Sequence, residues 1–151
     1  MSANFNPTGT LTGANSIITL SIANLYPAPF QLQQYAADDL TDVEAIDSAE
    51  VVMGVDGTLS AGFVYVPYKQ SVALQANSPS IVYFDTLWAT MQQQQDVYQI
   101  SGTILLPSIS MKYTLVNGYL TSYTAFPGVK KTLQPRKFTI AWNIIVPQAT
   151  A

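Results

Sequence analysis

Two segments of the chain carry most of its charged side chains, and their charges have opposite signs. Residues 38–50 hold six of the nine acidic residues, and residues 130–137 hold four of the six basic ones. Neighbouring carboxylates can bind calcium or act as a general acid and base, and clustered bases can bind phosphate. The candidate residues in the two segments are Asp38, Asp39, Asp42, Lys130, Lys131, Arg136 and Lys137.

The residue types present argue against catalysis in the acidic segment. Its sequence, DDLTDVEAIDSAE, lacks the Asp-x-Asp-x-Asp-Gly order of a calcium loop. The chain contains no histidine and no cysteine. This removes the usual general base, zinc–thiolate sites and every Ser-His or Cys-His nucleophile. Neither of the glycine-rich phosphate motifs, G-x-G-x-x-G and G-x-x-x-x-G-K, is present. We therefore expect no enzymatic activity, no cofactor and no metal.

The basic segment has three interpretations. Nucleic-acid binding is disfavoured, because the formal net charge is −3 and only Phe126 and Phe138 supply aromatic rings nearby. A solvated turn remains open as the alternative. We favour contact with the acidic segment of another copy, a head-to-tail arrangement that builds rings or filaments. Such exposed ion pairs would set register more than affinity, since each contributes about 0–1 kcal/mol.

The composition favours self-assembly of a single domain. Charged residues make up 10% of the chain, against roughly 25% in an ordinary soluble domain. Interface cores are depleted in charge and enriched in aromatic residues, although a secreted β-domain with a neutral surface is the alternative. We expect one domain over residues 1–151, with residues 1–14 as an extended N-terminal arm. No signal peptide or membrane helix is expected, because no apolar run is long enough.

Apolar periodicity predicts strands and one principal helix. In SIITLSIANL, Ile18, Leu20 and Ile22 lie on one face and Ile17, Thr19, Ser21 and Ala23 on the other, as in a half-buried strand. The prolines of the following YPAPF are expected to end it. A helix is predicted at about 78–94, with Ser78 as N-cap and Pro79 in the first position. Its apolar residues at helical spacing, all expected in the core, are Ile81, Phe84, Leu87, Trp88 and Met91.

Turn residues and alternation predict the remaining strands. Asp56-Gly57 and Asn117-Gly118 are each expected at a hairpin tip. The last strand is expected to bury Phe138, Ile140, Trp142, Ile144 and Val146. The predicted fold class is therefore mainly β, a sandwich or barrel of about seven or eight strands with one flanking α-helix.

The strand faces opposite the predicted core carry small, uncharged side chains. Such a face suits a surface that lines a channel or packs against a neighbouring sheet. Simple β-propensity is an equally good explanation, since threonine favours strands. The residues are Thr19, Ser21, Ala23, Gln99, Ser101, Thr103, Thr139, Ala141 and Asn143.

The order of these features resembles a known family. The segment FDTLWATMQQQQ is followed by YQISGTILLPSISMKYTLVNGYLTSYTAF, then KKTLQP and FTIAW, and the resemblance covers most of residues 38–142. The pattern is similar to the tail tube protein of contractile-tailed bacteriophages. The resemblance implies a virion protein assembled in the host cytoplasm, whose six-membered rings stack into a tube through which DNA passes.

The resemblance also implies partners and a role for one hairpin. The expected partners are further copies of the chain, the tail sheath and baseplate or terminator proteins, with no membrane. The hairpin residues Asp56, Gly57, Thr58 and Ser60 would lie in the inner barrel, although an ordinary surface hairpin is the alternative. Another virion module of the baseplate or fibre is the second interpretation of function, and a glycan-binding β-sandwich is the third.

Overall fold

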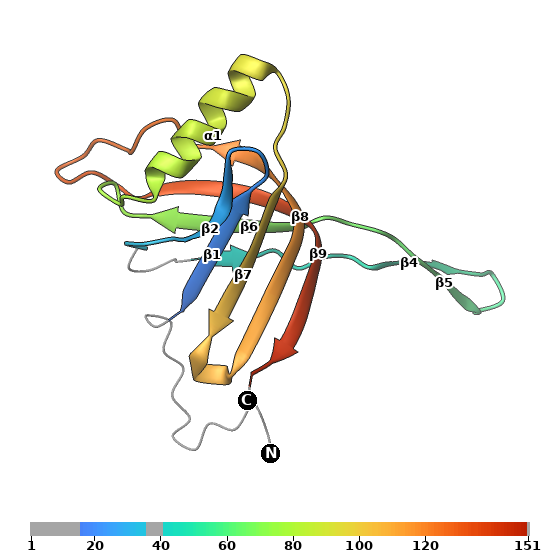
Figure 1. The fold of residues 1–151 in the computed structure, drawn as a ribbon. Helices are drawn as coiled ribbons and strands as arrows, with labels where there is room; N and C mark the ends of the chain where they lie inside the picture. The colour runs from blue at the N-terminus through green and yellow to red at the C-terminus, as the bar shows by residue number, and fades with distance from the viewer. Residues whose placement is uncertain (1–15, 36–40, 151) are drawn as a thin grey trace.

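Alternating apolar residues build a seven-stranded antiparallel sheet that curves around the core (Figure 1). The structure is a computed structural model that describes residues 16–35 and 41–150. The sheet has the order β2-β1-β7-β8-β9-β6-β3, and β4 and β5 form a separate hairpin. The strands are β1 (Ile17–Ile22), β2 (Tyr26–Gln31), β3 (Thr41–Val43), β4 (Ala49–Met53), β5 (Leu59–Phe63), β6 (Tyr68–Leu74), β7 (Ile100–Leu106), β8 (Met111–Tyr123) and β9 (Arg136–Ala149).

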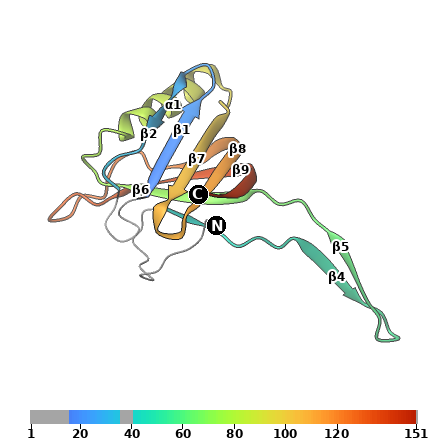
Figure 2. The ribbon, with the colours of Figure 1, turned by 60° about the horizontal axis from the view of Figure 1, so that its bottom comes forward.

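One α-helix, α1 (Ile81–Gln94), covers the open side of the curved sheet (Figures 1 and 2). A 3₁₀ turn at Pro107–Ile109 joins β7 to β8. Within the described residues the sheet is not a closed barrel, because β2 and β3 end the strand order. The predicted fold class, mainly β with one flanking helix, is confirmed.

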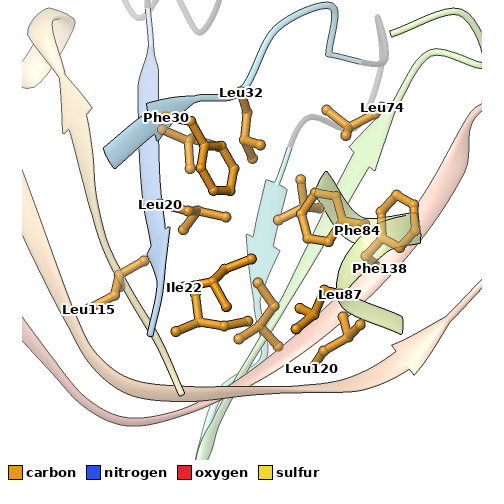
Figure 3. Packing of buried hydrophobic residues seen from close by; sticks show 14 of the residues in the cluster. Leu20, Ile22, Phe30, Leu32, Leu74, Phe84, Leu87, Leu115, Leu120 and Phe138 are labelled. Carbon is orange, nitrogen blue, oxygen red and sulfur yellow. The ribbon is translucent and has the colours of Figure 1, made fainter. Parts of the chain in front are cut away.

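The core lies between the curved sheet and α1 (Figure 3). Ile18, Leu20 and Ile22 of β1 are buried as their alternation predicts. From the helix, Phe84 stacks on Phe138 of β9, with ring centroids 4.4 Å apart. The remaining buried apolar residues include Leu32, Val72, Leu74, Ile81, Leu87, Ile100, Ile104, Leu115, Leu120, Ile140 and Trp142.

The prediction of a hairpin tip at Asn117-Gly118 is wrong. Residues 111–123 form one continuous strand, and the reversal between β7 and β8 occurs earlier, at the 3₁₀ turn and Ser110. Asn117 has a φ of 53°, and the pairing with β7 shifts here by one residue. The left-handed backbone at Asn117 therefore makes a β-bulge, which bends the long strand without ending it.

Two other strand predictions are also wrong in part. Pro27 and Pro29 lie within β2, and this is possible because β2 is an edge strand. Ile144 and Val146 are each 47% exposed, although Phe138, Ile140 and Trp142 are buried as predicted. Strand β6 pairs with β9 only as far as Trp142, so the rest of β9 extends past the core.

The predicted helix is confirmed, but its start differs from the prediction. The helix begins at Ile81, and neither Ser78 nor Pro79 has the expected capping position. The hydroxyl of Ser78 donates to the carbonyl oxygen of Gln33, and the Ser80 hydroxyl accepts from the Gln33 N–H at 2.9 Å. The two serines thus tie the segment after β2 to the helix start, which explains why both are buried.

Candidate assembly surfaces

The four predicted basic residues do not share one environment, because Arg136 is buried whereas Lys130, Lys131 and Lys137 are exposed. Arg136 Nη2 lies 2.8 Å from Asp85 Oδ1 on α1. The same guanidinium donates to the carbonyl oxygens of Thr124 and Ala125, at 2.7 and 3.1 Å. Arg136 therefore makes its contacts within its own chain, and the predicted role of the four basic residues between copies stays a prediction.

Tyr123 completes this cluster, in which Arg136 is buried and Asp85 and Tyr123 are partly exposed, and which sequence reasoning missed. Its hydroxyl donates to Asp85 Oδ1 and accepts from Arg136 Nη2 at 3.2 Å. Burial acts to raise the pKa of Asp85, but the hydrogen bonds from Arg136 and Tyr123 hold that pKa below its ordinary value. Asp85 is 51 residues from Arg136, and no sequence motif connects them. We call Asp85, Tyr123 and Arg136 the arginine cluster.

The arginine cluster fixes the root of the segment 124–135, which we call the basic loop. The loop projects from the body of the molecule (Figures 1 and 2). It contains a bridge between Val129 and Leu133, and the Gln134 N–H donates to the Gly128 carbonyl oxygen at 2.9 Å. Its exposed side chains include both lysines and three large apolar residues, Phe126, Val129 and Leu133.

The acidic residues of segment 38–50 that the structure describes lie in β3, in the connection to β4 and in β4 itself. Asp38 and Asp39 lie outside the described residues. Asp42 lies in the edge strand β3 and is exposed. Glu44 and Asp47 lie on the path into β4, Glu50 lies within β4, and all three are exposed. Asp42 and Glu44 thus lie at the edge of the main sheet, where the Glu44 N–H donates to the Lys69 carbonyl oxygen at 3.0 Å, whereas Glu50 lies on the β4–β5 hairpin.

The β4–β5 hairpin with its flanks, residues 44–65, forms a projection that we call the arm (Figures 1 and 2). The prediction of a hairpin at Asp56-Gly57 is confirmed, with Gly57 at a φ of 87°. The Gly54 N–H donates to the Thr58 carbonyl oxygen at 2.8 Å. The backbone N–H of Thr58 donates to the Asp56 carboxylate, and this lowers the pKa of Asp56. Asp56, Gly57, Thr58 and Ser60 are all exposed, and their inner-barrel role stays a prediction.

The arm exposes apolar side chains that a solvated hairpin would not need. Every residue of β4 and β5 is exposed. An isolated two-stranded hairpin is at best marginally stable in water, so an arm of this kind normally needs a covering surface. Its exposed large apolar residues are Val51, Val52, Met53, Val55, Leu59, Phe63 and Tyr65.

A hollow lined by uncharged residues, which we call the neutral hollow, lies on the sheet face opposite the core. Thr19, Thr103 and Thr114 are direct neighbours across β1, β7 and β8. Ser21 and Ser101 form the adjacent pair. The hollow has a volume of about 380 Å³, and no charged residue lines it. The uncharged face predicted from alternation therefore includes a hollow lined by small hydroxyl side chains together with apolar residues, among them Pro29 and Val116.

Trp88 was predicted to lie in the core, and this prediction is wrong. It is 39% exposed and stacks on Tyr123 of the arginine cluster, with ring centroids 5.0 Å apart. Helical spacing placed Trp88 beside Phe84 and Leu87, but its position lies at the rim of the face that α1 buries. Trp142, in contrast, is fully buried and donates from Nε1 to Gln70 Oε1 at 2.8 Å.

Within the described residues, no helix is long and apolar enough to span a membrane. In the same part of the chain, no three acidic side chains gather into a group that could hold a metal ion. The features that remain are surfaces: the arm, the basic loop and the neutral hollow.

Comparison with known proteins gives one family and several similar folds. The family model described as tail fiber protein gp32 matches residues 9–146. No curated protein matches the chain. A chain from the sheath/tube terminator of PVC, an extracellular contractile injection system, has a TM-score of 0.64 at 13% identity, covering 93% of this chain and 97% of that one.

Two further structures share the fold at similarly low identity. A chain from the cap that terminates the tube of the anti-feeding prophage has a TM-score of 0.59 at 12% identity, covering 93% of this chain and 92% of that one. A chain from the extended PVC sheath–tube complex has a TM-score of 0.54 at 16% identity, covering 88% of each chain. The fold of this chain is therefore one that occurs in contractile injection systems.

Proposed function

The chain belongs to the family of tail fiber protein gp32, and from this membership we propose that it is a ring-forming structural subunit of a tail tube. Family membership makes it a tail-related protein. The finer assignment to a tube is our proposal, in which rings, six-membered by the resemblance to tail tube proteins, stack to enclose a channel for DNA.

The observation that carries the proposal is the extent of the fold similarity. The similarity to a chain of the PVC sheath/tube terminator includes nearly the whole of both chains. Further similar chains come from the AFP tube cap and the PVC sheath–tube complex. A domain that shares most of its fold with chains from tube-terminating and sheath–tube assemblies is a good candidate for the same kind of assembly.

The neutral hollow supports a channel-lining role for one face of the sheet. DNA that passes through a tube should not be held by it. Each lysine or arginine that neutralises a phosphate strengthens binding through counterion release. The hollow combines hydroxyl side chains such as Thr19 and Thr114 with apolar residues such as Val116, and none of its lining residues would present a charge to passing phosphates.

The proposal includes the partners and the location of the protein. It would contact further copies of itself, the sheath and the baseplate or terminator proteins, in a virion tail assembled in the host cytoplasm. We also propose that it has no enzymatic activity, since the sequence lacks histidine and cysteine. Its function would then depend on interfaces alone.

A second candidate is a structural module of the baseplate or of a fibre. The description of the matching family as a tail fiber protein favours it. A chain of the AFP baseplate also shares the fold, with a TM-score of 0.57 at 12% identity, covering 93% of this chain and 96% of that one. This module would form one ring, or a short attachment, where the tube subunit forms many stacked rings.

Negative-stain electron microscopy of the purified full-length protein tests the proposal, together with sedimentation velocity over a range of concentrations. Stacked rings or tubes are the expected result. Single rings that never stack would favour the baseplate candidate. A monomer that persists at high concentration would contradict both.

A further inference from the structure

We propose that the arm of one copy docks on the basic loop of the next copy. This inference rests on the proposed function, because it names the contact through which neighbouring subunits would recognise one another. The arm is residues 44–65 and the basic loop is residues 124–135.

The charges of the two surfaces are complementary. The arm carries Glu44, Asp47, Glu50 and Asp56, and no basic residue occurs between positions 42 and 68. The basic loop carries Lys130 and Lys131, and no acidic residue occurs between positions 124 and 137. All six side chains are exposed. Complementary potentials of this kind guide encounter and reject the arm–arm and loop–loop alternatives.

Both surfaces also expose apolar side chains that a contact between them would bury. On the basic loop, Phe126, Val129 and Leu133 are 70%, 74% and 57% exposed. On the arm, Val52 and Phe63 are 68% and 70% exposed. An apolar group with a charged border is the usual anatomy of an interface between proteins, and burial of the apolar part supplies the affinity.

The positions of the two surfaces require the contact to be between copies. The arm leaves one side of the molecule and the basic loop leaves the opposite side, in both views (Figures 1 and 2). The arm of one copy therefore cannot reach the basic loop of the same copy. Because the two surfaces differ, the contact is head-to-tail, and repetition of it gives closed rings or open stacks.

The basic loop is held in place for such a contact. Arg136 donates to the carbonyl oxygens of Thr124 and Ala125 at the loop root and pairs with Asp85 on α1. The loop is therefore presented from the helix side by a buried anchor. A receptor surface fixed in this way loses little conformational entropy when the arm binds.

Cysteine cross-linking tests the contact without background, because the chain has no native cysteine. Val52→Cys marks the arm and Val129→Cys marks the basic loop. A mixture of the two full-length single variants, treated with a short bismaleimide, should give a cross-linked dimer that neither variant gives alone. The double variant should give a ladder of oligomers, because a head-to-tail contact repeats.

Charge reversal tests the chemistry of the contact. Lys130→Glu with Lys131→Glu should lower the cross-link yield about fivefold, a modest factor because exposed ion pairs are individually weak. Asp47→Lys with Glu50→Lys on the arm partner should restore it. Lys130→Glu alone and Lys112→Glu in β8, which lies outside both surfaces, make the same change of charge, and only the first should lower the yield.

The outcomes separate this inference from the proposed function. Rings or tubes that form without the arm–loop cross-link would overturn the inference and leave the function in place. Cross-linking of the arm variant to itself would also overturn the inference. A protein that stays monomeric throughout would overturn the function, and the inference with it.

Discussion

Gly118 of β8 lies directly against the indole ring of Trp142 in β9. A methyl group at position 118 would lie 2.4 Å from Trp142 Cε3, well inside contact distance. The two residues are register partners, and Trp142 is fully buried. Glycine is therefore required here for close packing, and not for a hairpin turn.

Gly118→Ala should destabilise the protein by about 3 kcal/mol, since an extra methyl group in a packed core forces neighbouring atoms to move. Chemical denaturation measures the change. Gly62→Ala in β5 is the matched control, because a methyl group there meets no atom within 4 Å. Equal effects of the two variants would show that the packing of Gly118 against Trp142 is not the cause.

Asp85→Asn should reduce stability most at neutral pH. The pKa of Asp85 is lower in the folded chain, so the ionised carboxylate stabilises the fold above the ordinary carboxyl pKa of 3.8. That contribution declines as the pH falls through the folded pKa, below 3.8. We expect a difference of about 1 kcal/mol at pH 7, after allowance for solvent screening. Urea titrations at pH 7 and pH 2.5 should show the two proteins converging in acid, and a constant gap would contradict the assignment.

Trp88→Ala should cost less than Phe84→Ala, although tryptophan is the larger residue. Phe84 is buried and stacked on Phe138, so its loss should cost about 3–5 kcal/mol. Trp88 is 39% exposed and loses mainly its stacking on Tyr123, which suggests about 1–2 kcal/mol. Unfolding free energies of the two variants provide the comparison. A larger loss for Trp88→Ala would place that residue in the core after all.

Replacement of residues 49–63 by Gly-Gly should leave the domain folded and prevent its assembly. The Val64 N–H donates to the Ser48 carbonyl oxygen at 2.9 Å, so the shortened connection has its ends already in place. All residues of β4 and β5 are exposed, and the free energy of unfolding should change by no more than about 0.5 kcal/mol. Circular dichroism and sedimentation velocity report the two properties separately. Assembly that survives the deletion would exclude the arm as an essential contact.

Local sequence patterns were sufficient to predict most elements of the fold. The alternation of Ile18, Leu20 and Ile22 predicted a half-buried strand, and the spacing of Ile81, Phe84 and Leu87 predicted the helix face. Asp56-Gly57 predicted a hairpin because the turn itself needs a left-handed residue. These features depend on neighbours in the sequence, which is why they could be predicted from it.

The predictions that were wrong concern positions whose conformation depends on residues distant in the sequence. Asn117-Gly118 has the residue types of a turn, but Trp142 fills the space beside Gly118 and the strand continues. Ser78 has the type of an N-cap, but its hydroxyl donates to the carbonyl oxygen of Gln33 and accepts from the Ser80 N–H at 3.3 Å, and the helix begins at Ile81. In both cases a contact with a residue far away in the chain accompanies the departure from the local prediction.

The sequence by itself determined the fold class, the single helix and the separation of acidic from basic residues. Only the tertiary structure decided which charges are available for contact. It buries Arg136 against Asp85 and leaves Lys130 and Lys131 exposed, although all three belong to one basic segment. The physical reason is that burial and pairing depend on which elements pack together, and Asp85 reaches Arg136 only because α1 lies across the start of β9.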